Sequence, residues 1–177
     1  MNFFYGISND LFKSELQIPL FKNRNLKKNK LKLFKAYPNN GKWTLEELSN
    51  KKKNDYFYIL KNKDIKNNDI FFLDNDSIYD QFDQKKLKDY NNFTNTNPPY
   101  RANFQLYIEN GGFSSFQSEY PYKMITNKGS IISSISSLAN SEADENYILI
   151  KNIFEYPIED NFTAYLVNYD NKNIEKQ

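Results

Sequence analysis

Residues 100–121 read YRANFQLYIENGGFSSFQSEYP, two alternating segments on either side of Asn110-Gly111-Gly112. Alternation of apolar and polar residues is typical of a half-buried strand, and an Asn-Gly-Gly loop is typical of a β-hairpin. We therefore expect strands over residues 100–109 and 113–121. A three-residue loop with a glycine in the left-handed conformation should join them.

A loop of three residues also fixes which residues of the two strands face each other. It places Glu109 opposite Phe113 and therefore Leu106 opposite Phe116. One face of the hairpin then carries the large apolar residues and is expected to meet the core. The opposite face carries hydrogen-bonding side chains, and it supplies the candidate ligand-binding residues Arg101, Asn103, Gln105, Tyr107, Gln117 and Glu119.

Two interpretations of this second face of the hairpin are open. It is either a solvated sheet surface or a recognition surface for a sugar-like or carboxylate ligand. In the predicted register Arg101 lies diagonal to Glu119, close enough for a structural ion pair. This arginine is therefore compatible with both interpretations.

Further segments concentrate apolar, aromatic and β-branched residues, and we interpret them as strands. Residues 31–34 alternate with lysine, which indicates an exposed edge strand with lysine on its solvent side. Residues 56–60 and 70–73 are expected to form a neighbouring antiparallel pair. Residues 147–154 form a nearly continuous apolar run that indicates a buried strand, with residues 162–167 as its partner.

Three segments favour short helices. Thr44 and Glu47 have the spacing of a capping box. Residues 77–90 contain a weak helical pattern, and residues 130–139 place apolar residues at the spacing of an amphipathic helix. Serines near the start of this last segment also offer a place where an anion could bind, although solvation alone explains them.

Strands dominate the pattern as a whole. The sequence predicts a single-domain β-sandwich or an α+β antiparallel sheet with a few short helices. We take residues 1–177 as one domain. A loop over residues 91–99 is the alternative internal boundary, and the tail over residues 170–177 is expected to fray.

The chain contains no histidine and no cysteine in its 177 residues. This composition excludes Ser-His-Asp catalysis, histidine-ligated zinc or haem, thiolate chemistry and a disulfide framework. No segment has the composition of a secretory signal or the length of a membrane span. We therefore expect a soluble cytoplasmic protein without a membrane partner, and no motif calls for a cofactor.

Two carboxylates follow the apolar segment Ile70-Phe71-Phe72-Leu73 directly, at Asp74 and Asp76. Such a pair at a strand end can hold Mg²⁺ or Mn²⁺, and Asp80 could join it. The motif resembles the Asp-x-Asp of metal-dependent nucleotide-sugar transferases, and with Ser77-Ile78 it is similar to the first motif of haloacid-dehalogenase-type phosphatases. The resemblance implies a metal-dependent enzyme acting on a phosphorylated or nucleotide-activated substrate.

The same carboxylates are also explained by a solvated turn with an aspartate capping the next helix. The chain lacks a clear phosphate-binding glycine loop after an early strand. We therefore expect Asp74 and Asp76 not to form a tight metal site.

A basic segment with aromatic neighbours, residues 22–35, gives a third alternative, a nucleic-acid-binding accessory protein. The segment contains a single arginine, and a solvated edge strand explains its lysines as well. We favour a non-catalytic binding or assembly domain, with a carbohydrate-like ligand or a protein partner. The metal-dependent enzyme and the nucleic-acid-binding protein remain the alternatives.

Overall fold

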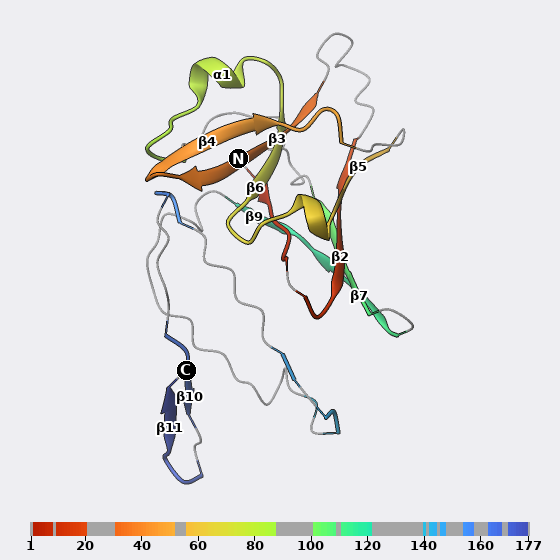
Figure 1. Cartoon of the computed structure of the whole chain (residues 1–177), viewed down its shortest axis with the longest axis vertical. Coiled ribbons are helices and arrows are strands. Elements are labelled where there is room, and N and C mark those ends of the chain that lie inside the picture. Colours follow the sequence, from red (N-terminus) through yellow and green to blue (C-terminus); the bar gives the residue numbers. More distant parts are fainter. Residues whose placement is uncertain are drawn as a thin grey trace.

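Two antiparallel β-sheets pack face to face in this protein and enclose the larger of two clusters of buried apolar side chains in the described chain (Figure 1). The computed structural model describes residues 2–8, 10–20, 31–51, 56–87, 101–108, 111–121, 140, 142–144, 146–147, 154–157, 163–167 and 170–176. The architecture confirms the prediction of a β-rich fold of the sandwich or antiparallel α+β kind.

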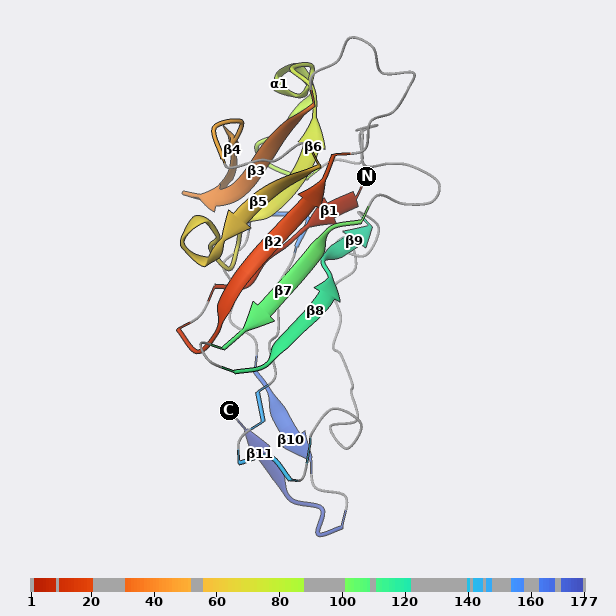
Figure 2. The same cartoon turned by 90° about the vertical axis from the view of Figure 1, so that its right-hand side faces the viewer.

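Sheet A has the strand order β4-β3-β6-β1-β9. Its strands are β1 Asn2–Phe4, β3 Lys32–Asn39, β4 Lys42–Glu47, β6 Ile70–Asp74 and β9 Glu119–Pro121. Sheet B has the order β5-β2-β7-β8, and Figure 2 looks onto it. Its strands are β2 Lys13–Pro19, β5 Phe57–Lys61, β7 Asn103–Tyr107 and β8 Phe113–Gln117.

Four short elements of the described chain accompany the two sheets. A 3-10 helix, η1 Asn62–Asp64, follows β5, and a four-residue helix, α1 Ile78–Gln81, follows β6. Strands β10 Tyr165–Val167 and β11 Ile174–Lys176 form a separate two-stranded ladder. No helix in the described part of the chain is long and apolar enough to cross a membrane.

The core between the sheets is built from alternate residues of both. Sheet A contributes Phe4, Leu33, Phe71 and Leu73, and sheet B contributes Leu16, Ile18, Tyr58, Leu60 and Phe104. Because side chains alternate along a strand, these residues recur at every second position of their strands. Burial of these large apolar side chains is the main force that holds the sheets together.

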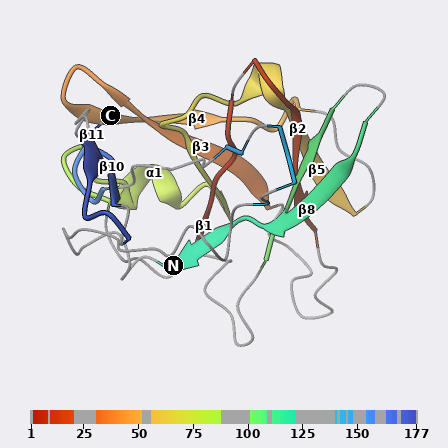
Figure 3. The same cartoon turned by 90° about the horizontal axis from the view of Figure 1, so that it is seen from below.

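A second core covers the other face of sheet A. Phe34, Trp43 and Phe72 pack there with Ile78 of α1 and with Leu87. Figure 3 shows α1 on the side of sheet A that faces away from sheet B. All five residues of β6 are consequently buried, whereas most outward residues of sheet B keep part of their surface exposed. Sheet B is therefore the sheet that has an accessible face.

The strand predicted at residues 31–34 exists, but its placement at a sheet edge is wrong. It belongs to β3, which lies between β4 and β6 with Leu33 and Phe34 fully buried. The helix predicted from Thr44 and Glu47 is also wrong, because these residues lie in β4. Asn40 and Gly41 both have positive φ, at 50° and 72°, and form a two-residue hairpin turn. After this turn the chain runs back beside β3 as β4. Residues 44 and 47 therefore pair with β3 instead of capping a helix.

Residues 56–60 and 70–73 contribute the strands β5 and β6, as predicted, but the expected pairing of these strands is wrong. Strand β5 pairs with β2 in sheet B, and β6 pairs with β3 and β1 in sheet A. The predicted helix over residues 77–90 reduces to α1, since the backbone is already extended at Phe82.

The hairpin of β7 and β8 is confirmed, but its predicted register is wrong by two residues. Tyr107 lies opposite Phe113, so the loop spans residues 108–112. Hydrogen bonds from Ile108 N to Gly112 O and from Gly111 N to Ile108 O close it. A shift by two residues keeps every side chain on its predicted face. The apolar face of β7 meets the core, whereas Phe116 on the edge strand β8 is 50% exposed, contrary to expectation.

Several predictions lie wholly or largely outside the described residues, namely the helix at residues 130–139, the strand at 147–154 and the boundary loop at 91–99. Residues 165–167 of the predicted partner strand form β10, whose three residues are exposed. In the segment expected to fray, residues 174–176 form β11 and pair with β10.

Candidate functional site

The outward face of sheet B gathers polar side chains from three adjacent strands. Antiparallel pairing aligns them in two rows, because residues directly opposite each other share a face. One row is Gln17, Asn103 and Gln117, and the other is Glu15, Gln105 and Ser115. We call these six residues the polar face.

A chain of hydrogen bonds orders four of the six residues of the polar face. The Ser115 hydroxyl donates to Asn103 Oδ1, and Asn103 Nδ2 donates to Gln17 Oε1 at 3.3 Å. Gln17 Nε2 then donates to Glu15 Oε1 at 2.7 Å. The chain runs from β8 across β7 to β2 and ends on a carboxylate, an acceptor that favours this direction of donation.

Two glutamines of the polar face stand outside this chain. Within the described residues, the side-chain amides of Gln105 and Gln117 make no hydrogen bond. Gln105 is half-buried and Gln117 is exposed. Each amide has two donor hydrogens and an acceptor oxygen, so both side chains can bind an external polar group.

The structure brings four of the six candidate ligand-binding residues together. Asn103, Gln105 and Tyr107 lie on the same side of β7, next to Gln117 on β8. Arg101 is exposed and precedes β7. Glu119 belongs to β9, where its backbone pairs with Phe4 of sheet A, and its side chain is outside the description.

The hairpin changes sheets between Gln117 and Glu119. Ser118 is fully buried, and its backbone N–H donates to Ala102 O. Its hydroxyl also accepts a hydrogen bond from Tyr5 N at 3.0 Å, which ties it to the segment after β1. The hairpin polar surface expected from the sequence therefore ends at Gln117 on sheet B.

The prediction from the hairpin missed Glu15 and Gln17 of the polar face. Both lie on β2, roughly ninety residues earlier in the chain, where Lys13-Ser14-Glu15-Leu16-Gln17-Ile18 alternates between polar and apolar residues. This alternation indicates a half-buried strand. It contains no information about which strand lies beside it, so the polar rows across three strands are visible only in the structure.

Asp74 and Asp76 have different environments at the end of β6. Asp74 is buried, and its Oδ1 accepts a hydrogen bond from Asn75 N at 2.8 Å. Asp76 is exposed and forms an ion pair with Lys32 at 2.7 Å. Within the described residues, no group of three or more acidic side chains is arranged to hold a metal ion.

Burial of Asp74 gives the protein a pH-dependent stability. Desolvation raises the pKa of the Asp74 carboxyl, and the hydrogen bond from Asn75 N–H opposes this shift only in part. The Asp74 carboxyl therefore binds its proton more tightly in the folded state than in the unfolded state. The stabilisation due to this proton is present below the unfolded pKa of about 3.9 and is lost as the pH rises through the folded pKa.

We predict that Asp74→Asn removes this loss. Asparagine is uncharged and keeps an oxygen acceptor for Asn75 N–H, so the variant should gain stability relative to the wild type as the pH rises from 4 to 7. Urea unfolding at several pH values measures this difference, with exposed Asp80→Asn as the control. A variant that loses stability relative to the wild type over this range would contradict the prediction. It would also be contradicted if Mg²⁺ stabilised the wild type and did not stabilise Asp74→Asn.

The polar face thus combines a fixed hydrogen-bond chain with two amides that have no partner in the described structure. It lies on the accessible side of sheet B, where a ligand can approach. Comparison with known proteins finds no significant similarity: no family model, no curated protein and no solved structure matches this chain.

Proposed function

We propose that this protein is a non-catalytic binding module and that its polar face binds a hydroxyl-rich, carbohydrate-like ligand. The observation that carries the proposal is the pair of amides at Gln105 and Gln117, which have no hydrogen-bond partner among the described residues. They are diagonal neighbours on adjacent strands, a separation of about 7–8 Å. A ligand with several hydroxyls can donate to and accept from both.

The hydrogen-bond chain beside these glutamines supports binding at low entropic cost. Asn103 and Gln17 are already held by their neighbours, so a ligand that contacts them does not have to order their side chains. Tyr107 continues the same face of β7 beyond Gln105. Its ring offers an apolar surface with a hydroxyl at the tip, a combination that suits the mixed surface of a sugar.

The charged groups of the described structure favour this proposal over the two alternatives. In the metal-dependent enzyme alternative, Asp74 and Asp76 would hold the metal ion, but Asp76 forms an ion pair with Lys32 at 2.7 Å, which competes with a metal ion for its carboxylate. In the basic segment, Lys32 pairs with Glu47 at 3.0 Å and Lys35 pairs with Glu46 at 2.8 Å. Lysines engaged in this way attract a nucleic-acid backbone less strongly than unpaired ones do.

We expect that replacing Gln105 and Gln117 by alanine weakens ligand binding without unfolding the protein. A glycan array would first identify an oligosaccharide that binds the wild type, and calorimetry would then compare the variants. Each substitution removes a hydrogen bond worth about 0.5–1.5 kcal/mol, so affinity should fall about two- to tenfold for each and more for the double variant. The melting temperature should stay within a few degrees, because both residues are at the surface.

Gln81→Ala is the matched control, since Gln81 is an exposed glutamine on α1, outside sheet B. It should leave the affinity unchanged. The proposal would be wrong if no oligosaccharide on the array bound, or if the double variant bound the selected oligosaccharide as tightly as the wild type does.

A further inference from the structure

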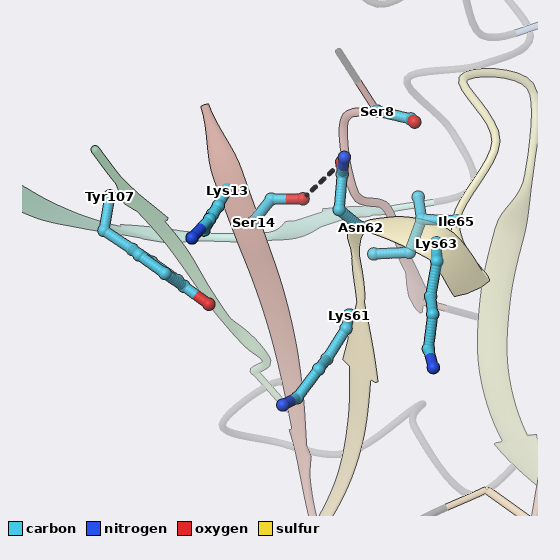
Figure 4. A pocket seen from close by; sticks show the side chains of 8 residues that line it. All are labelled: Ser8, Lys13, Ser14, Lys61, Asn62, Lys63, Ile65 and Tyr107. Carbon is cyan, nitrogen blue, oxygen red and sulfur yellow. Dashed lines mark hydrogen bonds between the residues drawn. The ribbon is translucent and has the colours of Figure 1, made fainter. Parts of the chain in front are cut away.

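A pocket of about 590 Å³ adjoins the polar face at one end of sheet B (Figure 4). It lies where β2 begins, β5 ends and η1 follows. Its lining is polar and basic, and it consists of Ser8, Lys13, Ser14, Lys61, Asn62, Lys63, Ile65 and Tyr107. Of the described residues that line this pocket, three are lysines and none is acidic.

Two lysines and a tyrosine connect the pocket to the polar face. Lys13 lies directly opposite Tyr107, and Lys61 lies directly opposite Glu15, so all of them are on the outward side of sheet B. Figure 4 shows the Lys61 side chain reaching from β5 towards β2, on the side where Lys13 and Tyr107 lie. Lys63 extends from η1 in another direction and lies at the rim.

Lys61 forms no ion pair with Glu15, the acidic residue that lies opposite it on β2. Lys35 and Glu46 lie directly opposite each other on the adjacent strands β3 and β4 and form an ion pair, as expected for opposite charges in this position. Lys61 and Glu15 face each other in the same way, yet the Glu15 carboxylate accepts from Gln17. Among the residues described, neither Lys61 nor Lys63 forms an ion pair.

The acid nearest in sequence to these lysines is also engaged elsewhere. Asp64 forms an ion pair with Lys51 at 2.8 Å and accepts a hydrogen bond from the backbone N–H of Lys61 at 3.2 Å. These contacts, together with the charge of Lys63, hold the pKa of its carboxyl below the ordinary value, although burial alone would raise it. The Asp64 carboxylate does not line the pocket.

Hydrogen bonds hold the floor of the pocket in place. Ser14 is 1% exposed, and its hydroxyl contacts Ile7 O and Asn62 Oδ1, each at 3.0 Å. The contact with Asn62, drawn as a dashed line in Figure 4, ties η1 to β2. The backbone that carries Lys61 and Lys63 is therefore anchored, and the lysine side chains extend from a fixed frame.

We propose that this pocket is an anion subsite that takes a phosphate, sulfate or carboxylate group. Lys13, Lys61 and the Tyr107 hydroxyl supply positive charge and hydrogen-bond donors, and Lys63 adds charge at the rim. The link to the polar face rests on the proposed function: a ligand that lies over Gln105 would place an acidic substituent in this pocket. The ligand class is then an acidic carbohydrate, with a neutral part on the polar face and a charged group among the lysines.

NMR titration of the isotope-labelled protein with inorganic phosphate, at constant ionic strength, tests the subsite. Backbone amide signals of Lys61, Asn62, Lys63 and Tyr107 should shift, and a higher constant salt concentration should weaken binding. Lys61→Gln should weaken phosphate binding about two- to fivefold, and Lys61→Gln with Lys63→Gln should weaken it further. Lys66→Gln is the control, because Lys66 is exposed and does not line the pocket.

This experiment distinguishes an error in the anion subsite from an error in the proposed function. The double Gln105→Ala, Gln117→Ala variant should bind phosphate like the wild type, whether or not oligosaccharides bind the polar face. Absence of shifts at the pocket, or equal losses in Lys66→Gln and Lys61→Gln, would overturn the anion subsite. If phosphate binds but a phosphorylated oligosaccharide binds no more tightly than its neutral counterpart, the link between the pocket and the polar face is overturned.

Discussion

Phe71→Ala is expected to cost about 3–5 kcal/mol of the free energy of unfolding, the range for removing a fully buried phenylalanine. Phe71 is 0% exposed on β6, in the core between the two sheets. Its backbone pairs with Phe4 of β1 on one side and with Lys35 of β3 on the other. Neighbours on both sides restrict collapse around the missing ring, so a cavity should remain.

Phe116→Ala is the matched control for this substitution. It removes the same atoms from a half-exposed residue on the edge strand β8, and it should cost less than about 1 kcal/mol. Denaturant unfolding of the two variants measures the difference. Similar losses in both would contradict the assignment of β6 to the interior and of β8 to the edge.

Trp43→Ala is expected to have the second large effect, also about 3–5 kcal/mol. Trp43 is the single tryptophan of the chain and is buried on the outer side of sheet A. Its Nε1 donates to Glu155 O at 3.0 Å, and the same carbonyl accepts from Leu87 N at 2.9 Å. The indole therefore joins β4 to two segments that follow much later in the chain.

Trp43→Phe separates the two contributions of this side chain. Phenylalanine keeps most of the apolar packing but loses the donor, and Leu87 N still satisfies the carbonyl, so the cost should be about 1 kcal/mol. Unfolding followed by circular dichroism compares the variants without relying on tryptophan fluorescence. A loss below about 1 kcal/mol for Trp43→Ala would mean that the second core does not form as described.

The hairpin of β7 and β8 was predictable because its signals are local. Alternation identified both strands and assigned Phe104 and Gln105 to opposite faces, as the structure confirms. The loop length was not predictable in the same way. Ile108 and Glu109 fit either the strand or the loop, and a shift of two residues preserves the pattern of faces. The burial pattern therefore cannot distinguish a loop of three residues from one of five.

The remaining errors arise where local signals compete or where partners are distant in sequence. Thr44 and Glu47 match a capping box, but Asn40 and Gly41 favour a hairpin turn, and pairing with β3 decides between them. Strands β5 and β6 are consecutive in the chain yet belong to different sheets. Such choices depend on which apolar faces can be buried together, which no single segment encodes.

The part of the polar face on β2 was unpredictable for the same reason. Gln17 and Glu15 complete the hydrogen-bond chain that begins at Ser115, although about a hundred residues separate them from β8. Their alternation indicates a strand, but the strand order β5-β2-β7-β8 determines that they contribute to one surface. The candidate site is therefore a product of the topology rather than of a motif.

The side-chain amide signals of Gln105 and Gln117 provide the most direct test of the polar face. These NH₂ groups can be followed by NMR during titration with an oligosaccharide selected on the array. Binding at the polar face should shift both signals, together with backbone signals of β2, β7 and β8. Shifts confined to β3, β4 and α1, with both glutamine signals unchanged at saturation, would contradict the assignment of sheet B as the binding surface.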